Sequence, residues 1–505
     1  MAALQAIIGI DIGTTSTKSV VFVSEGVQLG SSNVGYPLLH PQPGWAEQDP
    51  EAIFKAVLAS VRGAIAEAGI TGEQVAGVGI STAMHSLIAM NAAGRALTPS
   101  ITWADGRSEE QARRLRAEHG TIYLRTGTPI HPMSPLAKLV WLREHRPDVH
   151  EAAAKFVSIK EYVLYRLFGE WAVDASIASA TGLLALDSLD WDLEALQVTG
   201  LTADRLSAVH PGTYRLSGMD AGFAADMGLP ADTPFFLGGS DGGLANIGVG
   251  AIDPGELAVT IGTSAAVRMM TDRPATDPYG RTFCYNVEGP SYIIGGATNN
   301  GGIVLQWLSE SMLAGNGGAA SVESLLEAAA RVSPGANGLL FLPFLSGERA
   351  PIWNAEARGT FFGATLSHRG EHFVRAGLEG VMLAVLSVTE VLKELAGPAR
   401  EVRASGGFAK SPLWRQMLTD MLGQPVVVPQ VTEASALGAA VVAMQGLGLL
   451  GSWREAKVWM PARETLEPDL QAHAAYREVL GVYTRLCEKL PESFADVARL
   501  QRALG

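Results

Sequence analysis

Apolar and polar positions alternate in blocks along the first 90 residues of the chain. Residues 7–23 form two apolar runs, rich in isoleucine and valine, on either side of a polar break at residues 13–18. Two such runs around a glycine-containing break predict a β-hairpin. Residues 50–69 carry apolar side chains at every fourth position from Ile53 to Ile65, which predicts a helix, and residues 75–90 return to strand composition.

The hairpin pattern recurs about halfway along the sequence. Residues 256–270 consist of an apolar run, Gly-Thr-Ser and a second apolar run. The glycine of this second break, Gly262, follows Gly13 by 249 positions (262 − 13) in a chain of 505 residues. We therefore predict two halves built alike, residues 1–250 and 251–505, each long enough to bury its own core.

The second half alternates between two kinds of segment. Short β-branched runs are separated by helical stretches at residues 372–395 and 435–445, and residues 469–504 have helical composition without a strand signal. Alternating strands and helices are typical of an α/β fold. The fold class predicted from the pattern is therefore α/β.

Charge and cysteine content narrow the classes of partner. The net charge is −13, the sequence pI is about 5.3, and no cluster of five or more lysines and arginines occurs. The two cysteines, Cys284 and Cys487, lie in no metal-binding spacing, no 18-residue apolar segment exists, and no basic segment precedes the first apolar run. We expect a reduced, cytoplasmic protein with no nucleic-acid partner and no membrane partner.

The polar break of the first hairpin has the chemistry of an anion-binding turn. Glycine and small hydroxyl residues leave backbone N–H groups exposed and add O–H donors, so a phosphate can approach closely. Lys18 could add a point charge, and Asp11, just before the break, is suited to hold a magnesium-bound water. The alternative is a plain surface hairpin in which threonine serves β-propensity. The second copy, with Thr263 after Gly262, favours the anion-binding interpretation.

Two other nucleotide motifs are excluded. No Gly-Lys pair occurs, so the P-loop motif GxxxxGK[ST] is absent. The one GxGxxG segment, at residues 446–451, follows a helical run rather than a strand, so it does not fit a dinucleotide-binding fingerprint.

Asp241 is the strongest candidate for acid–base chemistry. It follows an apolar strand at residues 235–237 and is flanked by glycines in "GGSDGG", which leaves its carboxylate open to a ligand. Phosphoryl transfer to an alcohol requires one group that accepts the hydroxyl proton. The alternative is that Asp241 caps the following helix.

The motifs "GIDIGTTSTK", "GGSDG", "VTIGTS", "GERAP" and "SGGFAKSPLWRQ" resemble, in this order, those of the FGGY carbohydrate kinases. The resemblance extends over residues 7–446 and implies two actin-like, ribonuclease-H-like α/β domains with an ATP cleft between them. It also implies ATP-dependent phosphorylation of a terminal hydroxyl. The segments 81–108 and 125–142, with "IKEYVLYRLFG" and "NNGGIVLQW", resemble the branch that converts D-gluconate to 6-phospho-D-gluconate.

The resemblance implies roles for individual residues. Asp241 is implied as the general base and Asp11 as the residue on the magnesium side. Ser411 occupies a position where relatives often carry asparagine, which puts its contact with the nucleotide in doubt. The remaining residues implied at the ATP phosphates or the nucleotide wall are Thr14, Thr15, Lys18, Thr263, Gly302, Gln306 and Gly407.

The acceptor side is less well defined. Relatives that act on glycerol carry Arg-Glu where this chain has Met84-His85, and sugar-kinase relatives carry Met-His. Trp103, Met133 and His131 complete the candidate substrate-binding residues, together with Asp241 itself. Without the resemblance, these residues could equally be core or loop residues. A substrate carboxylate needs a cationic or N–H-rich partner, for which His85, His131 and Lys138 are candidates.

We thus expect an ATP- and Mg²⁺-dependent kinase whose small-molecule substrates are D-gluconate and ATP. Members of the family that it resembles are often dimers, so this protein could form a homodimer. One alternative is a kinase of the same family for xylulose or glycerol. Another is an actin-like ATPase without a small-molecule acceptor.

Overall fold

The computed structural model describes residues 5–312, 321–431 and 433–504. The chain divides into two compact units. The first unit consists of Met1–Asp253, Thr271–Ile293 and Val431–Pro461, and the second of Pro254–Met270, Ile294–Gln430 and Ala462–Gly505. Each unit has a central sheet of its own. The division into folding domains at residue 250 stays a prediction.

The first unit is built on a sheet whose strands run in the order β11-β12-β5-β1-β2-β3. β1 and β2 form the predicted hairpin, which is confirmed, and β1, β5 and β12 are parallel neighbours. Because the carboxyl ends of parallel strands meet at one edge of a sheet, Asp11 and Asp241 lie at the same edge. The strands are β1 (Ala6–Ile12), β2 (Ser16–Phe22), β3 (Gln28–Gly35), β5 (Val75–Thr82), β11 (Arg215–Leu216) and β12 (Phe235–Ser240).

Helix α1 (Pro50–Ala68) covers one face of this sheet and confirms the predicted helix. Its start is specified by Asp49, whose side chain accepts a hydrogen bond from the Glu51 N–H, and by proline at the first helical position. Its end is specified by Gly69, which has a φ of +67°. The helix packs against β2 and β3 and buries the predicted apolar stripe in the core.

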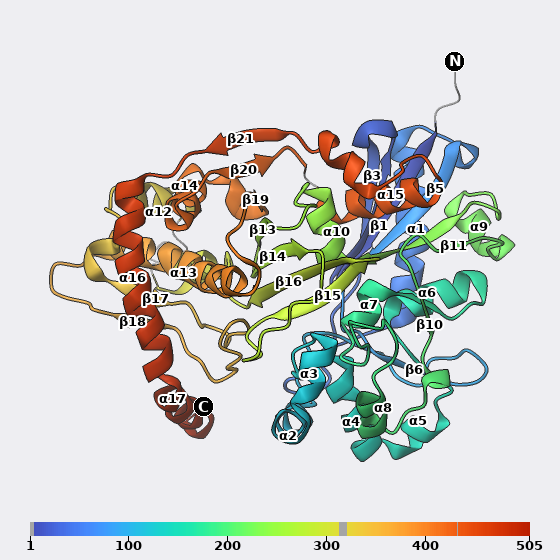
Figure 1. Ribbon diagram of the computed structural model, residues 1–505, viewed down its shortest axis with the longest axis horizontal. Coiled ribbons are helices and arrows are strands. Elements are labelled where there is room, and N and C mark those ends of the chain that lie inside the picture. Colours follow the sequence, from blue (N-terminus) through green and yellow to red (C-terminus); the bar gives the residue numbers. More distant parts are fainter. Residues whose placement is uncertain (1–4, 313–320, 432, 505) are drawn as a thin grey trace. The chain divides into compact units, whose positions relative to one another are not determined.

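Helix α15 (Ala434–Gly446) covers the opposite face, although it is far away in sequence. It packs against β1, β5 and α10 (Asp241–Gly248), and Figure 1 shows it beside the blue strands. The approach requires glycine, because a Cβ on Gly9 would lie 1.9 Å from the Ala436 carbonyl oxygen. A Cβ on Gly79 would lie 2.0 Å from the Ala439 carbonyl oxygen. Backbone-to-backbone contact therefore sets the position of α15.

Between β5 and β12 the chain adds a largely helical region with its own apolar core. Helices α4 and α6 belong to this region and each carries one fully buried lysine. The elements of this region, with β4, are β4 (Glu47–Gln48), β6 (Ile88–Met90), β7 (Ser100–Ile101), α2 (Glu109–His119), α3 (Thr121–Thr126), α4 (Pro135–His145), α5 (Pro147–Ala152), β8 (Lys155–Val157), α6 (Ile159–Phe168), β9 (Ala172–Asp174), α7 (Ala175–Ser179), α8 (Leu193–Thr199), β10 (Ala208–His210) and α9 (Ala221–Met227).

The second unit repeats the strand order of the first, as the recurring pattern predicted. Its strands run in the order β16-β14-β13-β19-β20-β21, with β13 antiparallel to β14 and parallel to β19. β13 therefore corresponds to β1, β14 to β2 and β19 to β5. The strands are β13 (Glu256–Ile261), β14 (Ala265–Thr271), β16 (Ser291–Thr298), β19 (Glu401–Ser405), β20 (Val426–Pro429) and β21 (Ala462–Leu466); β15 (Phe283–Glu288) precedes β16.

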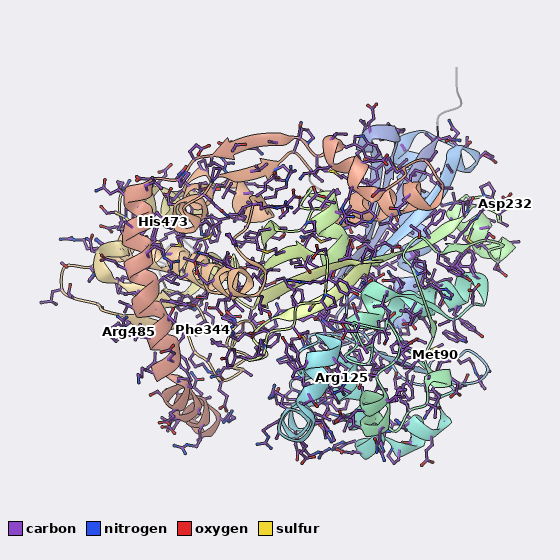
Figure 2. The ribbon with its side chains drawn as sticks, in the orientation of Figure 1. Met90, Arg125, Asp232, Phe344, His473 and Arg485 are labelled. Carbon is purple, nitrogen blue, oxygen red and sulfur yellow. The ribbon has the colours of Figure 1, made fainter. Side chains whose placement is uncertain are left out.

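The helices of the second unit include the predicted helical tail. Phe344, labelled in Figure 2, lies with its ring centroid 6.4 Å from that of Tyr483 and 6.2 Å from that of Phe494, so it packs against both C-terminal helices. In the part of the chain that the structure describes, no helix has the length and apolar character needed to cross a membrane. The elements are α11 (Ile303–Trp307), α12 (Val322–Ala330), β17 (Leu340–Leu342), β18 (Thr360–Phe362), α13 (Gly370–Ala396), α14 (Pro412–Leu422), α16 (Leu470–Lys489) and α17 (Pro491–Leu504).

We predict that Gly79→Ala lowers the free energy of unfolding by about 3 kcal/mol, because the added methyl group overlaps the α15 backbone, which cannot move without repacking. Urea titration followed by fluorescence measures the change. Gly35→Ala is the control, since its Cβ would lie 3.7 Å from the nearest atom, and we expect a change within about 1 kcal/mol. Equal stability of the two variants would contradict the packing argument.

Candidate functional site

Asp11 and Asp241 form an acidic pair at the carboxyl edge of the first sheet. Asp11 accepts a hydrogen bond from the Ser81 Oγ at 2.8 Å and faces Lys18 across the hairpin. Burial raises the pKa of Asp11 to about 6, and the negative charges of Asp241 and Glu433 add to the rise, against the opposing effects of Ser81 and Lys18. Negative charge is thus concentrated at this edge, where a cation would relieve the repulsion.

The Asp241 carboxylate is held at the start of α10. Its Oδ1 accepts a hydrogen bond from the Gly242 N–H at 2.7 Å. The residue before it, Ser240, is the N-cap, since the Ser240 Oγ accepts from the Gly243 N–H at 3.2 Å. Ser240 is fixed in turn by Ser176, whose Oγ donates to the Ser240 Oγ at 2.7 Å. Ser240, and not Asp241, therefore caps α10.

Lys160 fixes the strand that leads to Asp241, and sequence reasoning missed it. Its fully buried Nζ donates to the carbonyls of Leu237 and Gly239, at 2.9 and 2.8 Å, and to the Asp174 Oδ2 at 2.6 Å. Burial lowers the pKa of Lys160, and the charge of Asp174 opposes this. The bonds bracket a residue with a φ of +67°, Gly238, where the pairing of β12 with β5 is interrupted. No pattern along the sequence marked this lysine, since the polar residues Ser158 and Glu161 lie on either side of Ile159 and Lys160.

The first hairpin turn is closed by backbone and tyrosine contacts. The Gly13 N–H donates to the Ser16 carbonyl at 3.0 Å, and the Tyr36 Oη donates to the Gly13 carbonyl at 2.7 Å. The Tyr36 N–H donates to the Thr15 carbonyl, while the Thr15 side chain is exposed. Lys18 forms an ion pair with Glu433 at 2.9 Å. An anion in this turn would therefore compete with Glu433 for the lysine.

Trp103 connects this turn to the candidate acceptor residues. Its Nε1–H donates to the Thr14 Oγ1 at 2.8 Å. His85 is buried with a φ of +68°, and its Nδ1 donates to the Ala180 carbonyl at 2.7 Å. Met84 packs beside a small apolar cluster that includes Val173. The hydroxyl turn and the Trp103 loop are therefore in direct contact.

His131 and Met133 lie in the loop before α4. The Met133 N–H donates to the His131 Nδ1 at 3.2 Å, so the histidine is oriented by its own loop. Met133 is 4% exposed, and its side chain belongs to the interior of the unit.

Lys138 joins the candidate acceptor segments to one another. Its Nζ donates to the carbonyls of His85, Thr102 and Met133 at 2.7, 2.7 and 2.8 Å, and its side chain is fully buried. Burial lowers the pKa of Lys138 to about 7, against the charge of Asp105. An ammonium whose donors all face carbonyls cannot contact a substrate carboxylate, which corrects the expectation for Lys138 drawn from the sequence.

The second unit has a corresponding turn that docks on a glycine pair. The Gly301 N–H donates to the Thr263 carbonyl at 2.9 Å, and the Gly302 N–H donates to the Gly262 carbonyl at 2.7 Å. The Thr263 side chain is exposed. The motifs "VTIGTS" and "NNGG" therefore form one hydrogen-bonded assembly.

The "GERAP" motif, residues 347–351, holds the segment before this glycine pair through hydrogen bonds to Asn299. Glu348 accepts from the Asn299 N–H at 2.5 Å, and the Arg349 Nε–H donates to the Asn299 Oδ1 at 2.7 Å. Burial raises the pKa of Glu348 to about 7, although the N–H donors of Asn299 and Arg349 oppose the rise. The carboxylate thus positions the residues that precede the glycine pair.

The remaining candidates of the second unit are spread over three elements. Gln306, on α11, donates to the Glu310 Oε1 at 3.0 Å. Gly407 begins a short 3₁₀ helix (Gly407–Lys410), and a Cβ there would meet no atom within 4 Å. Ser411 is the N-cap of α14 and accepts from the Trp414 N–H at 3.3 Å. The Ser411 side chain therefore has a structural function in this chain.

Each predicted site residue can be assigned to one unit. The metal, acceptor and first-turn candidates lie in the first unit, and Thr263, Gly302, Gln306, Gly407 and Ser411 lie in the second. Among the residues that the structure describes, no three or more His, Cys, Asp and Glu side chains gather at a potential metal site. A cation at Asp11 would need ligands from a bound substrate or water.

Both halves of the chain match one family. Residues 6–248 match the N-terminal domain of the FGGY family of carbohydrate kinases, and residues 257–447 match its C-terminal domain. Kinases of this family use ATP as the phosphate donor.

Individual relatives are similar over nearly their whole length. The chain is 43% identical to the gluconokinase of Bacillus subtilis, over 98% of each chain. Its fold matches the crystal structure of gluconate kinase from Lactobacillus acidophilus with a TM-score of 0.94 and 34% identity, over 98% of this chain and all of the other. The ligand-bound xylulose kinase from Lactobacillus acidophilus matches with the same TM-score, identity and coverage.

We predict that Asp11→Asn raises the free energy of unfolding by about 2 kcal/mol at pH 8 in EDTA, because it removes a desolvated charge beside Asp241. The folded-state pKa of Asp11 lies above its unfolded value. Its stabilising contribution is therefore present below about pH 4 and is lost as the pH rises through about 6. The advantage of the variant should accordingly shrink as the pH falls from 7 to 4.

Urea titrations between pH 4 and pH 8 measure this difference. Asp232→Asn, at an exposed position of the same unit, is the control, and we expect a change within about 0.5 kcal/mol at every pH. A gap between wild type and Asp11→Asn that does not depend on pH would contradict the electrostatic explanation.

Proposed function

Because this chain belongs to the FGGY family of carbohydrate kinases, we propose that it transfers the γ-phosphoryl group of ATP to D-gluconate and forms 6-phospho-D-gluconate. The observation that carries the choice of gluconate is the identity to the Bacillus subtilis gluconokinase along nearly the whole of both chains. The equal structural similarity to a xylulose kinase makes the acceptor the part of the proposal that most needs a test.

Asp241 is the general base of this proposal. Its carboxylate follows a strand that Lys160 holds rigidly, and the Gly242 N–H orients one of its oxygens. A carboxylate at this place is suited to accept the proton of the acceptor hydroxyl as the phosphoryl group is transferred. The neighbouring glycines leave space for an acceptor.

The hydroxyl turns supply phosphate binding in this proposal. In the first unit, Thr14, Thr15 and the turn amides would donate to phosphate oxygens, and Lys18 would leave Glu433 to contact the nucleotide. In the second unit, Thr263 is the corresponding donor. The remaining nucleotide contacts are assigned to Gly302, Gln306, Gly407 and, because it also caps a helix, less directly to Ser411.

Asp11 fits the magnesium side of the nucleotide. Mg²⁺ in kinases typically takes one or two carboxylates and completes its coordination with phosphate oxygens and water. The raised pKa of Asp11 marks a carboxylate whose charge lacks compensation in the protein alone. Bound Mg²⁺ would neutralise charge on the phosphate oxygens.

The acceptor would contact Met84, His85, Trp103, His131 and Met133. With Lys138 excluded, His85 and His131 remain as partners for the gluconate carboxylate. His131 is the more accessible of the two, since its side chain is partly exposed whereas that of His85 is 9% exposed.

Asp241→Asn is expected to lower kcat about a thousandfold while the KM for ATP changes less than about threefold, because the amide cannot accept the hydroxyl proton. Steady-state kinetics with gluconate measure both constants. Asp232→Asn serves again as the control and should retain wild-type turnover. Near-normal kcat in Asp241→Asn would refute the assignment of the base.

A coupled ADP-release assay against gluconate, xylulose, ribulose, fuculose and glycerol tests the substrate. We expect kcat/KM to be highest with gluconate, by at least about a hundredfold, and mass spectrometry to identify phosphogluconate. A preference for xylulose would overturn the acceptor and leave the family intact. ADP release that does not depend on any acceptor would favour an ATPase.

A further inference from the structure

We propose that Lys138 is a positioning residue that sets acceptor selectivity: one buried ammonium holds the His85, Trp103 and Met133 segments in mutual register without touching the acceptor. The inference rests on the proposed function, because those segments are its acceptor-binding residues. It adds a residue that would affect selectivity by positioning the acceptor-binding residues and not by contacting the acceptor.

The first argument is geometric. The three carbonyls that Lys138 binds belong to loops that are distant in sequence: the loop after β5, the loop after β7 and the loop before α4. Each carbonyl belongs to a candidate acceptor residue or to its immediate neighbour, Thr102 preceding Trp103. The Ile101 carbonyl lies further away, at 3.4 Å. Helix α4 therefore orients all three loops through a single atom.

The second argument concerns His85, whose backbone has a φ of +68°. A residue with a side chain adopts this conformation at a cost of about 1 kcal/mol or more, so surrounding contacts must maintain it. Lys138 binds the His85 carbonyl, and the Ala180 carbonyl accepts from the His85 ring. Loss of the ammonium would release the backbone and allow the ring to turn.

The third argument is that charge balance supports an ammonium at this place. Asp105 and Glu47 both pair with Arg107, at 2.7 and 2.5 Å, and the charges of Asp105 and Arg107 act on Lys138 in opposite directions. These buried side chains comprise two cations and two anions. An apolar replacement of Lys138 would remove the ammonium donor from three buried carbonyls, of which the Thr102 carbonyl would keep the Asp105 N–H at 3.2 Å.

The test compares Lys138→Met with Lys160→Met, in which an equally buried lysine with three oxygen partners is lost. For Lys138→Met, we expect the KM for gluconate to rise about tenfold or more and the KM for ATP to stay within about twofold. The preference for gluconate over glycerol should fall by a similar factor. For Lys160→Met, the loss should appear in kcat, with the gluconate KM within about threefold.

A purely structural role for Lys138 predicts a different result. A smaller fraction of correctly folded enzyme lowers the apparent kcat and leaves KM unchanged, so that outcome would overturn the proposal. Lys138→Gln, whose amide still donates two hydrogen bonds, is the second variant and should show an intermediate KM. If both variants of Lys138 are insoluble while Lys160→Met folds, Lys138 is a folding residue and the proposal is wrong.

The test of Lys138 can be distinguished from the test of the proposed function. If the wild type prefers an acceptor other than gluconate, the substrate assignment fails, and the same comparison is made with the preferred acceptor. A changed KM and selectivity for that acceptor would still support Lys138 as the positioning residue, and unchanged values would overturn it.

Discussion

A polar group that is removed from water has to find its hydrogen-bond partners inside the protein, and in the first unit this constraint applies to two fully buried lysines. Lys138 gathers the carbonyls of three loops, and Lys160 gathers two carbonyls of β12 and the Asp174 carboxylate. Each ammonium joins chain segments that lie far apart in sequence, and two of the segments that Lys138 joins are also connected by the antiparallel bridge between Leu87 and Ile101. The candidate acceptor residues and Asp241 lie on or next to those segments, so the geometry of the site depends on these cations.

The acidic pair of Asp11 and Asp241 carries the opposite charge at the same sheet edge. Ser81, Lys18 and the Gly242 N–H compensate it only in part, and the pKa of Asp11 stays raised. Such a pair lowers the stability of the protein alone and favours a bound cation. The arrangement is what a phosphoryl-transfer site requires, because charge that is left uncompensated in the free protein is available for a metal–nucleotide complex.

The two units share a strand–turn–strand hairpin in the same place of the sheet, but different residues contact the turn in each unit. In the first, the hydroxyl turn is tied to Trp103 and its lysine is paired with Glu433. In the second, the turn docks on Gly301 and Gly302 and is supported by Glu348. A repeated strand–turn–strand unit thus supplies a similar backbone twice, and its neighbours decide which side chains surround each turn.

The sequence by itself determined the elements whose signals are local. The two hairpins, α1 with its caps and the helical tail follow from the spacing of apolar residues and from short capping motifs, and the ordered motifs identified the family. The tertiary structure decided the rest: the approach of α15 to Gly79, the cap of α10 at Ser240 and the roles of Lys138 and Lys160. The sequence does not distinguish a lysine that contacts a substrate from a buried lysine that donates to backbone carbonyls. Only the fold brings distant carbonyls within 3 Å of its ammonium, because hydrogen-bond partners far apart in sequence leave no periodic pattern along the chain.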